Sequence, residues 1–536
     1  MKRVIVNSIL LVMAMAFFFR CEKEKPFEGP APTVLVLNYE GGLILQEPNA
    51  DVVVDVQVGA SAGIELFEIF INDSLIRSET YSDEFRFDFS YTFRIPENAQ
   101  DGENFNHVFK VTGSDGVTAE SQIVRIRAGN PYSVSEETID GIAFTVIKGR
   151  INEDLKLSSG TNWLMDSVVS VENDVTLTIN EGTTVYFRSS PSDQYVSRLA
   201  ITQGSRIVAE GSPVAPIVFT SDKVLLGGPQ QQDWGGLFLC GNAPTNQGSA
   251  LLEDGFRYGG NSVTDNSGTL SYVRIEYAGK DELHALQLHG VGRSTTLDHI
   301  QVWECYNIGI RIRGGDFRIK YLAAINHGGY GLWADEGWQG EGQFWLFQTD
   351  IMATLIPINY WNQARSLEFR NDENFFLNQP RTNFKIANVT LIGNGWEEGG
   401  SFGTRRGFRV RRGALGVLQN VLVTNFPDDA ARVEDLDLQE LGTDMILDNS
   451  RVWGNRVNWG QEAESFFFSS GNYNLTEDPV NGLGTENFVG SVSSPFNPIA
   501  LGSWFDSAPY MGAVENNAND WTAEGEWFKD INGNIR

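Results

Sequence analysis

The sequence has little cysteine, little histidine and a deficit of positive charge, and each shortage excludes a class of protein. Three cysteines in 536 residues cannot build a disulfide framework, and we expect Cys240 and Cys305 to be buried free thiols. Five histidines without a His-x-His or His-x-x-x-His spacing do not predict a zinc site. The 40 basic residues stand against 69 acidic ones, and the net charge of −29 argues against nucleic-acid binding.

Long hydrophobic runs are also scarce, apart from one near the N-terminus. There a basic start precedes an apolar stretch over residues 4–19, and Cys21 follows it closely. A stretch of this kind is typical of a signal peptide and is short for a membrane span. We therefore predict a signal peptide over residues 1–20, a tether over residues 21–32, and export of the chain.

The position of Cys21 resembles the lipidation site of bacterial lipoproteins, although Arg20 stands where such signals usually carry a small residue. The resemblance implies a lipid on Cys21 as the membrane attachment. Glu22 and Glu24 resemble the export tag of surface lipoproteins in Bacteroidota, which implies an outer-membrane, cell-surface location. Secretion without a lipid is the alternative.

The composition predicts an all-β chain built from two domains. Glycine is abundant, at 56 residues, and short runs rich in Val, Ile and Phe are separated by Asn and Asp. Over residues 33–129 the alternation of polar and apolar residues, with turns such as Asn72-Asp73, predicts an immunoglobulin-like β-sandwich. We interpret this module as a spacer. Its expected strands are residues 33–37, 51–58, 64–71, 85–93, 107–112 and 121–126.

Residues 130–536 form the second domain, where short apolar strands recur about every two dozen residues. Residues 175–179 alternate apolar and polar side chains before a turn at Asn180-Glu181-Gly182. Such a period predicts a right-handed parallel β-helix, in which each coil buries its apolar face against the next. Further strands are expected at residues 269–277, 295–303, 307–313, 317–322, 383–392, 407–412 and 414–424.

A set of motifs recurs in a fixed order along this second domain, at residues 176–183, 215–221, 233–238, 241–244, 272–279, 298–302, 337–340, 510–513 and 520–522. In content and order these motifs resemble a largely uncharacterised β-helix surface lipoprotein family of Bacteroidota. The resemblance covers nearly all of residues 135–530 and implies fold and location more than chemistry. The sequence departs from the family pattern at His327-Gly328-Gly329-Tyr330, where an acidic pair is usual, so a cation held by that pair is not expected here.

Aromatic residues gather between residues 330 and 361, and they are the first candidates for a binding site. Flat side chains stack on the apolar faces of sugar rings, while neighbouring polar groups bond the hydroxyls. The alternative is that some of them fill the interior of the solenoid, which the family pattern favours for Trp338. The candidates for ligand contact are Tyr330, Trp333, Trp345, Tyr360 and Trp361.

Rows of arginine are the second candidate. If Ile310 and Ile312 point inward, strand alternation directs Arg311 and Arg313 outward. The same alternation around residues 408–410 exposes Arg409 and Arg411. Such a cationic stripe would suit a uronate, a sulfate or another anionic glycan. The alternative is a set of solvated arginines paired with neighbouring acids.

Acidic pairs are the third candidate, because polysaccharide lyases and glycoside hydrolases share this fold. Hydrolysis needs paired carboxylates, and elimination needs a basic residue beside calcium-neutralised carboxylates. Asp335-Glu336, Asp372-Glu373 and Asp428-Asp429 are the pairs to consider, but none lies in a specific motif. We assign no catalytic residue and expect no cofactor, with calcium entering only under the lyase hypothesis.

The sequence therefore favours a cell-surface lipoprotein that acts as a non-catalytic binding or accessory protein. Its expected partners are a polysaccharide and an outer-membrane uptake system, and the long face of stacked strands suits an extended polymer. Two alternatives remain open. One is a polysaccharide lyase or glycoside hydrolase, and the other is an adhesin or a scaffold for a protein partner.

Overall fold

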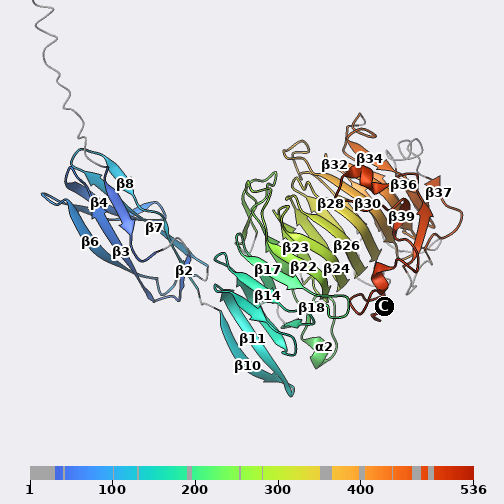
Figure 1. Ribbon diagram of the computed structural model, residues 1–536, viewed down its shortest axis with the longest axis horizontal. Helices are drawn as coiled ribbons and strands as arrows, with labels where there is room; N and C mark the ends of the chain where they lie inside the picture. Colours follow the sequence, from blue (N-terminus) through green and yellow to red (C-terminus); the bar gives the residue numbers. More distant parts are fainter. Residues whose placement is uncertain are drawn as a thin grey trace, which may run out of the picture. The chain divides into compact units, whose positions relative to one another are not determined.

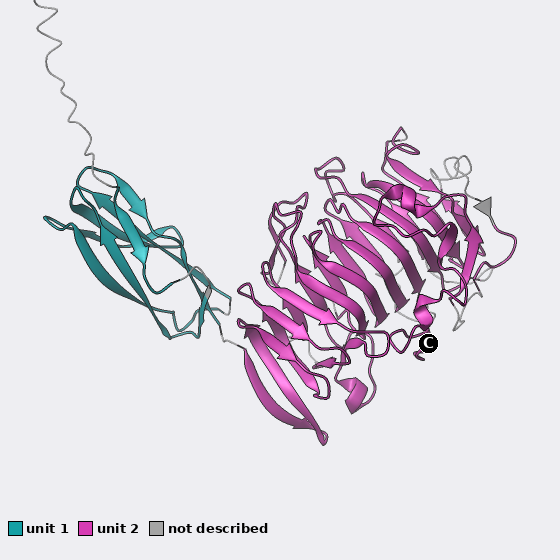
Figure 2. Cartoon of the chain, viewed as in Figure 1, with its two compact units in different colours: residues 1–131 teal, residues 132–536 magenta. Residues whose placement is uncertain are grey.

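The computed structural model describes residues 31–39, 43–100, 102–129, 132–189, 196–252, 255–280, 282–349, 365–396, 405–437, 439–460, 473–480 and 488–536. The chain divides into two compact units, residues 1–131 and 132–536 (Figure 2). Within the described ranges, no helix is long and apolar enough to span a membrane. Cys21, Tyr360 and Trp361 lie outside the described residues, as do the whole expected signal peptide and most of the tether.

The first unit is a sandwich of two sheets (Figure 1). One sheet has the order β1-β3-β6, and the other has the order β2-β9-β7-β4-β5 with β8 beside β7. The strands are β1 (Thr33–Val36), β2 (Leu43–Gln46), β3 (Asp51–Gly59), β4 (Ile64–Ile71), β5 (Ser74–Thr80), β6 (Arg86–Arg94), β7 (Asn104–Gly113), β8 (Thr118–Glu120) and β9 (Val124–Ala128).

Period-2 alternation builds this sandwich, as the sequence predicts. In β3 the residues Val52, Val54, Val56 and Val58 are buried, while the residues between them face water. Asn72-Asp73 has the positive φ values of 48° and 63° that close the hairpin between β4 and β5. Strands β2, β5 and β8 are not predicted by the alternation, since they are short or largely exposed.

The second unit is a right-handed parallel β-helix, which confirms the predicted fold class (Figure 1). Strands β10 and β11 pair antiparallel, and all the other pairings in this sheet of the described chain are parallel. Its strands before the central coils are β10 (Ser133–Ile139), β11 (Ile142–Ile151), β12 (Leu155–Leu157), β13 (Trp163–Val171), β14 (Thr176–Ile179), β15 (Thr184–Phe187), β16 (Arg198–Ile201), β17 (Arg206–Glu210), β18 (Ile217–Ser221) and β19 (Gly236–Cys240).

Each central coil consists of one long strand and one short strand. The long strands are β22 (Gly268–Glu276), β24 (Thr296–Cys305), β26 (Arg318–His327), β28 (Glu341–Thr349), β30 (Asn383–Ile392) and β32 (Leu415–Thr424). The short strands are β23 (Leu286–His289), β25 (Ile310–Arg313), β27 (Leu332–Asp335), β29 (Arg365–Phe369), β31 (Arg406–Val410) and β33 (Asp429–Val433). The remaining elements are α2 (Lys223–Leu226), β20 (Ala250–Leu251), β21 (Arg257–Tyr258), β34 (Met445–Asp448), β35 (Arg451–Trp453), β36 (Val457–Gly460), β37 (Tyr473–Asn474), β38 (Gly490–Ser493), β39 (Tyr510–Val514) and two short 3-10 helices, Pro498–Leu501 and Trp521–Ala523.

A residue of positive φ bends each long strand so that it serves two faces of the coil. In β24 this residue is His299, with a φ of 49°. Its ring stacks at 4.2 Å on Tyr272 of the coil before and at 4.2 Å on Tyr321 of the coil after. Asn388 and Asn420 hold the same place farther along, and asparagine is among the residues that adopt this conformation most readily.

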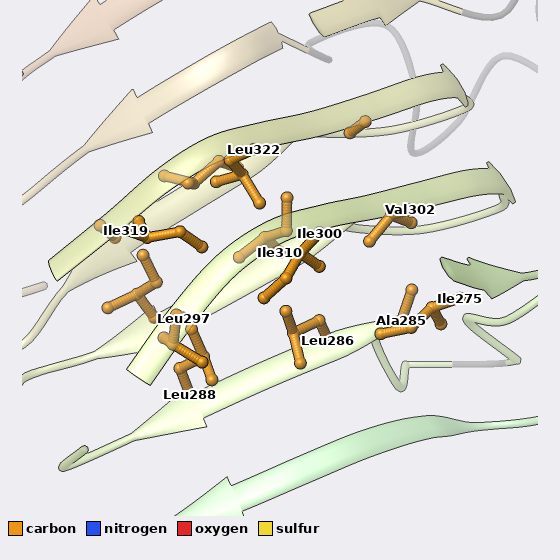
Figure 3. Packing of buried hydrophobic residues seen from close by; sticks show 14 of the residues in the cluster. Ile275, Ala285, Leu286, Leu288, Leu297, Ile300, Val302, Ile310, Ile319 and Leu322 are labelled. Atoms are coloured by element: carbon orange, nitrogen blue, oxygen red, sulfur yellow. The ribbon is translucent and has the colours of Figure 1, made fainter. Parts of the chain in front are cut away.

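The core is a continuous stack of apolar side chains inside the coils. Figure 3 shows Leu286, Ile310 and Leu322 of neighbouring coils pointing into it. Ile308, Ile310 and Ile312 are buried as predicted, and so are Phe408 and Val410. The aliphatic rows fix the register of each strand, because a one-residue slip would turn them to the outside.

The C-terminal segment, residues 488–536, runs back along the corner formed by the bent long strands. Asn388 of β30 donates a hydrogen bond to the carbonyl of Tyr510 at 2.6 Å. Three long strands earlier in the stack, Gln301 of β24 donates to the carbonyl of Lys529 at 2.7 Å. Trp527 is fully buried in the cluster formed there. This corner is therefore covered by the chain itself, whereas the outer face of the short strands lies on another side of the coil.

Candidate functional site

The outer face of the short strands carries arginine, acid and aromatic side chains in register. Arg311 pairs with Trp333, Trp333 with Glu368, and Glu368 with Arg409 across four successive strands. We call this surface the arginine face. It consists of the outward side chains on β25, β27, β29 and β31 and the residues that directly follow them: Arg311, Arg313, Trp333, Asp335, Glu336, Glu368, Arg370, Arg409 and Arg411.

Trp333 lies between two guanidinium groups. Arg311 sits 4.3 Å from the indole centroid and Arg370 sits 4.1 Å from it, both within the range of cation–π attraction. Tyr330 lies beside Trp333, with ring centroids 5.5 Å apart, and its hydroxyl accepts a hydrogen bond of 2.9 Å from Arg365. The structure thus brings two of the predicted aromatic candidates, Tyr330 and Trp333, together with a predicted arginine candidate, Arg311.

Glu368 is a fully buried carboxylate that accepts three guanidinium groups. Arg365, Arg370 and Arg411 approach it at 2.7, 2.6 and 2.8 Å. Burial alone would raise the pKa of Glu368, but these arginines outweigh it and hold the pKa below its usual range. The carboxylate is therefore charged, and it anchors the centre of the face.

Positive charge exceeds negative charge around this centre. Among the described residues, Glu373 is the other carboxylate here, and it bonds Arg370 at 3.2 Å and also Arg412. Even leaving Arg365 aside, Arg370, Arg411 and Arg412 share two carboxylates. Burial lowers the pKa of Arg411, and so does repulsion from Arg370 and Arg409, so an added anion would relieve this crowding.

Farther along the face the charges balance. Arg409 and Arg432 both bond Glu434. Arg432 also reaches Asp429 at 2.9 Å, and Arg406 bonds Asp428 at 2.8 Å. This end of the face is a closed ion-pair network rather than a row of free cations.

Five buried polar atoms on the face have no hydrogen-bond partner within the described part of the chain. Two of them, Nε of Arg313 and Oε2 of Glu368, lie within ion-pair distance of Glu336 and Arg365. The other three are the indole Nε1 of Trp333, Oδ1 of Asp335 and Nε of Arg409. Buried polar groups in native proteins are nearly always bonded to protein, water or ligand. Two donors and one acceptor of the face therefore lie unpaired beneath its surface, where an ordered water would satisfy them.

A second polar cluster lies at the start of the face, beneath β20 and β21. Tyr258 donates a hydrogen bond of 2.8 Å to Glu336, and Arg313 lies 3.7 Å from the same carboxylate. Burial, with the nearby charge of Asp335, raises the pKa of Glu336. The rings of His289 and Tyr258 lie 5.3 Å apart at an angle of 50°, and burial holds the pKa of His289 well below the ordinary value. Glu336 is thus the carboxyl on this face best suited to hold a proton.

The three predicted acidic pairs are all engaged by other groups of the chain. Asp335 bonds Arg311 at 2.7 Å. Burial alone would raise the pKa of Asp372, but hydrogen bonds from the backbone N–H groups of Asn374 and Phe375 and from two side chains lower it. Burial raises the pKa of Asp428, although Arg406 opposes it. The first two pairs lie at or after the ends of the short strands β27 and β29, the third lies at the start of β33, and each has its own partners.

Calcium, which lyases of this fold use, finds no suitable donor set here. In the described ranges, no group of three or more His, Cys, Asp or Glu side chains is placed to hold a metal ion. The carboxylates on the face are bonded to arginine, and Ca²⁺ needs six to eight oxygen ligands. The described residues therefore do not fit a protein-bound calcium ion.

Two expectations about the site need correction. Trp345 was expected to contact ligand, but it is fully buried in the core, where it stacks on Trp338 at 6.3 Å. Arg311, Arg313, Arg409 and Arg411 point outward as predicted but are not free and solvated. Arg311 is only 4% exposed, because Trp333 and Asp335 of the next coil cover it.

The residues that sequence reasoning missed are Arg365, Glu368, Arg370 and Tyr258. Alternation could have found two of them, since Leu367 and Phe369 are inward and so place Glu368 and Arg370 outward. Tyr258 sits on a short strand of an excursion, and nothing in its local pattern indicates that it reaches Glu336.

The comparison with protein families agrees with this architecture. The model of the pectate-lyase-like β-helix domain matches residues 149–476. Two crystal structures of pectate lyase Pel3 from Pectobacterium carotovorum are similar. One is 11% identical, covering 60% of this chain and 86% of that chain with a TM-score of 0.12, and the other is 10% identical, covering 83% and 100% with a TM-score of 0.15. No curated protein matches the sequence. The family match spans more than half of the residues, and the chain belongs to the family of pectate-lyase-like β-helix proteins.

Proposed function

We propose that the arginine face binds an acidic polysaccharide without cleaving it. The observation that carries the proposal is Glu368, a buried carboxylate that accepts three guanidinium groups on a chain of net charge −29. Arginines are concentrated here against the overall charge of the protein. A guanidinium fork matches the geometry of a carboxylate or sulfate group better than any other side chain.

The aromatic and unpartnered polar groups support a sugar as the bearer of the anion. Trp333 is half-buried and offers its ring edge to a sugar, while the carboxylate of the sugar would meet Arg370 or Arg411. The indole N–H of Trp333 and Oδ1 of Asp335 are unpaired beneath the surface, and an ordered water there would link them to sugar hydroxyls. Successive rungs lie about 4.8 Å apart, so a polymer laid along the stack would meet several such groups.

The location is part of the proposal. A lipid on Cys21 would tether the chain to the outer membrane, and the acidic residues behind it would direct it to the cell surface, as in the Bacteroidota lipoproteins that it resembles. The sandwich would act as a spacer. The β-helix would then capture glycan for an outer-membrane uptake system.

Cleavage is the second candidate function, and Glu336 is the observation that favours it. A carboxyl whose pKa is raised by burial, beside Tyr258 and Arg313, is the kind of group that donates or accepts a proton. Against cleavage, the other acids of the face are bonded to arginine. We therefore rank binding first.

The test is a binding panel with the chain produced from residue 22 onward, so that no lipid is attached. Polygalacturonate, a sulfated glycan and neutral dextran are titrated, and product release is followed in the same samples with and without calcium. Binding of the acidic polymers alone, without product, supports the proposal. Product that disappears in Glu336→Gln would replace binding by cleavage.

A matched arginine provides the control. Arg411→Ala removes a guanidinium from the centre of the face, whereas Arg77→Ala removes one from β5 in the first unit. Binding lost in the first variant and kept in the second places the ligand on the face. Binding lost in neither variant, or no binding of any glycan, would shift the function to adhesion or to a protein partner.

A further inference from the structure

Strand β6 of the first unit has an open edge. All nine of its residues pair with β3, from Arg86 opposite Gly59 to Arg94 opposite Asp51. Among the strands that the structure describes, β3 is its one hydrogen-bonded neighbour. The strand carries charged residues only on its outer face and contains no proline and no bulge that would block this edge. An unprotected edge of this length is a template for another strand.

The flanking hydrogen bonds show which backbone groups face the open edge. Ala60 N–H donates to the carbonyl of Phe85 at 2.9 Å, and Ile95 N–H donates to the carbonyl of Ala50 at 2.9 Å. In an antiparallel ladder, hydrogen-bonded residues alternate along the strand. Odd-numbered residues of β6 therefore bond β3. The groups that point to the open edge belong to Arg86, Asp88, Ser90, Thr92 and Arg94.

The side chains leave this edge accessible. On the inner face a row of four aromatic residues is half-buried against the core: Phe87, Phe89, Tyr91 and Phe93. On the outer face the polar side chains lean toward β3, since Arg94 bonds Asp51 at 2.7 Å and Ser90 bonds Asp55 at 2.6 Å. The aromatic row would become fully buried if another strand continued the sheet.

The sequence of β6 is nearly symmetric about Ser90. It reads Arg-Phe-Asp-Phe-Ser-Tyr-Thr-Phe-Arg. If a second copy pairs antiparallel with Ser90 opposite Ser90, then Phe87 faces Phe93 of the other copy and Phe89 faces its Tyr91. This register also places the even-numbered residues of β6 in hydrogen-bonded positions, where their backbone N–H and C=O groups, which point to the open edge, find partners. The aromatic pairs then fall in the non-hydrogen-bonded positions, where side chains are closest.

We propose that two copies of this chain associate through β6, joining their β1-β3-β6 sheets into one continuous sheet across a two-fold axis. One contact opposes the pairing, because Arg86 faces Arg94 of the other copy. Asp51 neutralises Arg94, however, through two hydrogen bonds of 2.7 and 2.8 Å. Two chains of net charge −29 also repel one another, so salt strengthens the dimer by screening.

Sedimentation velocity of the chain produced from residue 22 onward tests the proposal. The wild type shifts from monomer to dimer as its concentration rises, and at a lower concentration when salt is added. Ser90→Pro removes an N–H group that faces the open edge and not β3, so the strand is kept while the dimer is lost. A wild type that stays monomeric at its highest soluble concentration overturns the proposal.

Cysteine cross-linking tests the register without relying on proline. Ser90→Cys places two thiols across the two-fold axis, with Cα atoms about 5.5 Å apart, within disulfide reach. The native Cys240 and Cys305 are buried and do not interfere. Thr92→Cys is the matched control, because Thr92 faces Asp88 of the other copy. Ser90→Cys cross-links under mild oxidation and Thr92→Cys does not. Equal cross-linking of the two variants, or of neither, overturns this pairing.

Discussion

Trp333 shows at the level of a single residue how a structural contact and a binding surface coincide. Its ring lies between Arg311 and Arg370, yet its indole N–H has no partner within the described chain. The ring therefore orders two cations, and its unpaired N–H lies beneath the surface, where a bound water would link it to a ligand. The same side chain positions the charged groups and contributes to the surface on which a sugar would lie.

Trp333→Ala should weaken binding of an acidic polysaccharide by at least about tenfold, which corresponds to about 1.4 kcal/mol. The loss has two physical sources, because the sugar loses its ring and both arginines lose their support. Isothermal titration measures it. The control is Trp504→Ala on the C-terminal segment. Trp504 is half-buried, and Nζ of Lys320 lies 4.8 Å from the centroid of its ring. Equal affinities of Trp333→Ala and wild type would contradict a role for this ring.

Glu368→Gln should destabilise the fold, because it leaves three buried guanidinium groups without their shared carboxylate. Breaking a buried ion pair by removing one partner costs about 3–5 kcal/mol. Glu373→Gln is the control, since that side chain is 61% exposed and a surface pair contributes at most about 1 kcal/mol. Urea unfolding compares the two variants, and similar losses would show that the Glu368 cluster is not a stabilising centre.

The same carboxylate predicts a dependence of stability on pH. Arg365, Arg370 and Arg411 hold its folded pKa below the unfolded value, despite burial. Its contribution is therefore complete above the unfolded pKa of about 4.3 and is lost as the pH falls through the folded pKa. In unfolding measured from neutral to acidic pH, the wild type should lose stability more steeply than Glu368→Gln. Parallel curves would exclude this linkage.

At the level of elements, the short strands and the bent long strands have different partners. The long strands carry aromatic and asparagine residues at their bends, and these contact the C-terminal segment: Asn388 bonds Tyr510, and Tyr272 packs against Trp527. The short strands carry arginine and acid. Among the described residues, the C-terminal segment covers the bends and not the outer face of the short strands, which is the surface that we propose for a polymer.

Trp527→Ala should loosen the C-terminal segment from the coils. Trp527 is fully buried against Tyr272 and His299, and truncation of such a side chain costs about 3–5 kcal/mol. We expect faster hydrogen exchange in residues 488–536 and a lower unfolding free energy. Phe375→Ala, at a side chain 71% exposed, should change neither. Unchanged exchange in Trp527→Ala would mean that the segment is held by other contacts.

How far the sequence predicts this molecule also depends on the element. The strand at residues 383–392 is predicted with its observed bounds, Asn383–Ile392, because apolar residues alternate on both sides of the bend at Asn388. The inward positions of Ile310 and Ile312 follow from the same rule. The burial of Arg311 does not, because it depends on Trp333 and Asp335 of the next coil, and the turn between the strands decides which residues meet. Trp345 was misplaced for the same reason.

At the level of the whole molecule, charge is distributed unevenly. The chain carries a net charge of −29, which repels polyanions at long range. The arginine face reverses this locally, with Arg370, Arg411 and Arg412 sharing Glu368 and Glu373. An acidic polymer would thus be repelled by most of the surface and held at one place, which makes binding selective rather than general.

The most direct test of this account is a titration of one polymer in two forms, polygalacturonate and its carboxyl-reduced, neutral counterpart, against wild type and Arg411→Ala. The account predicts that wild type binds the acidic form at least about tenfold more tightly, and that Arg411→Ala abolishes this preference. Equal affinity of the wild type for both forms, or a preference that survives in Arg411→Ala, would contradict an anion-binding function of the arginine face.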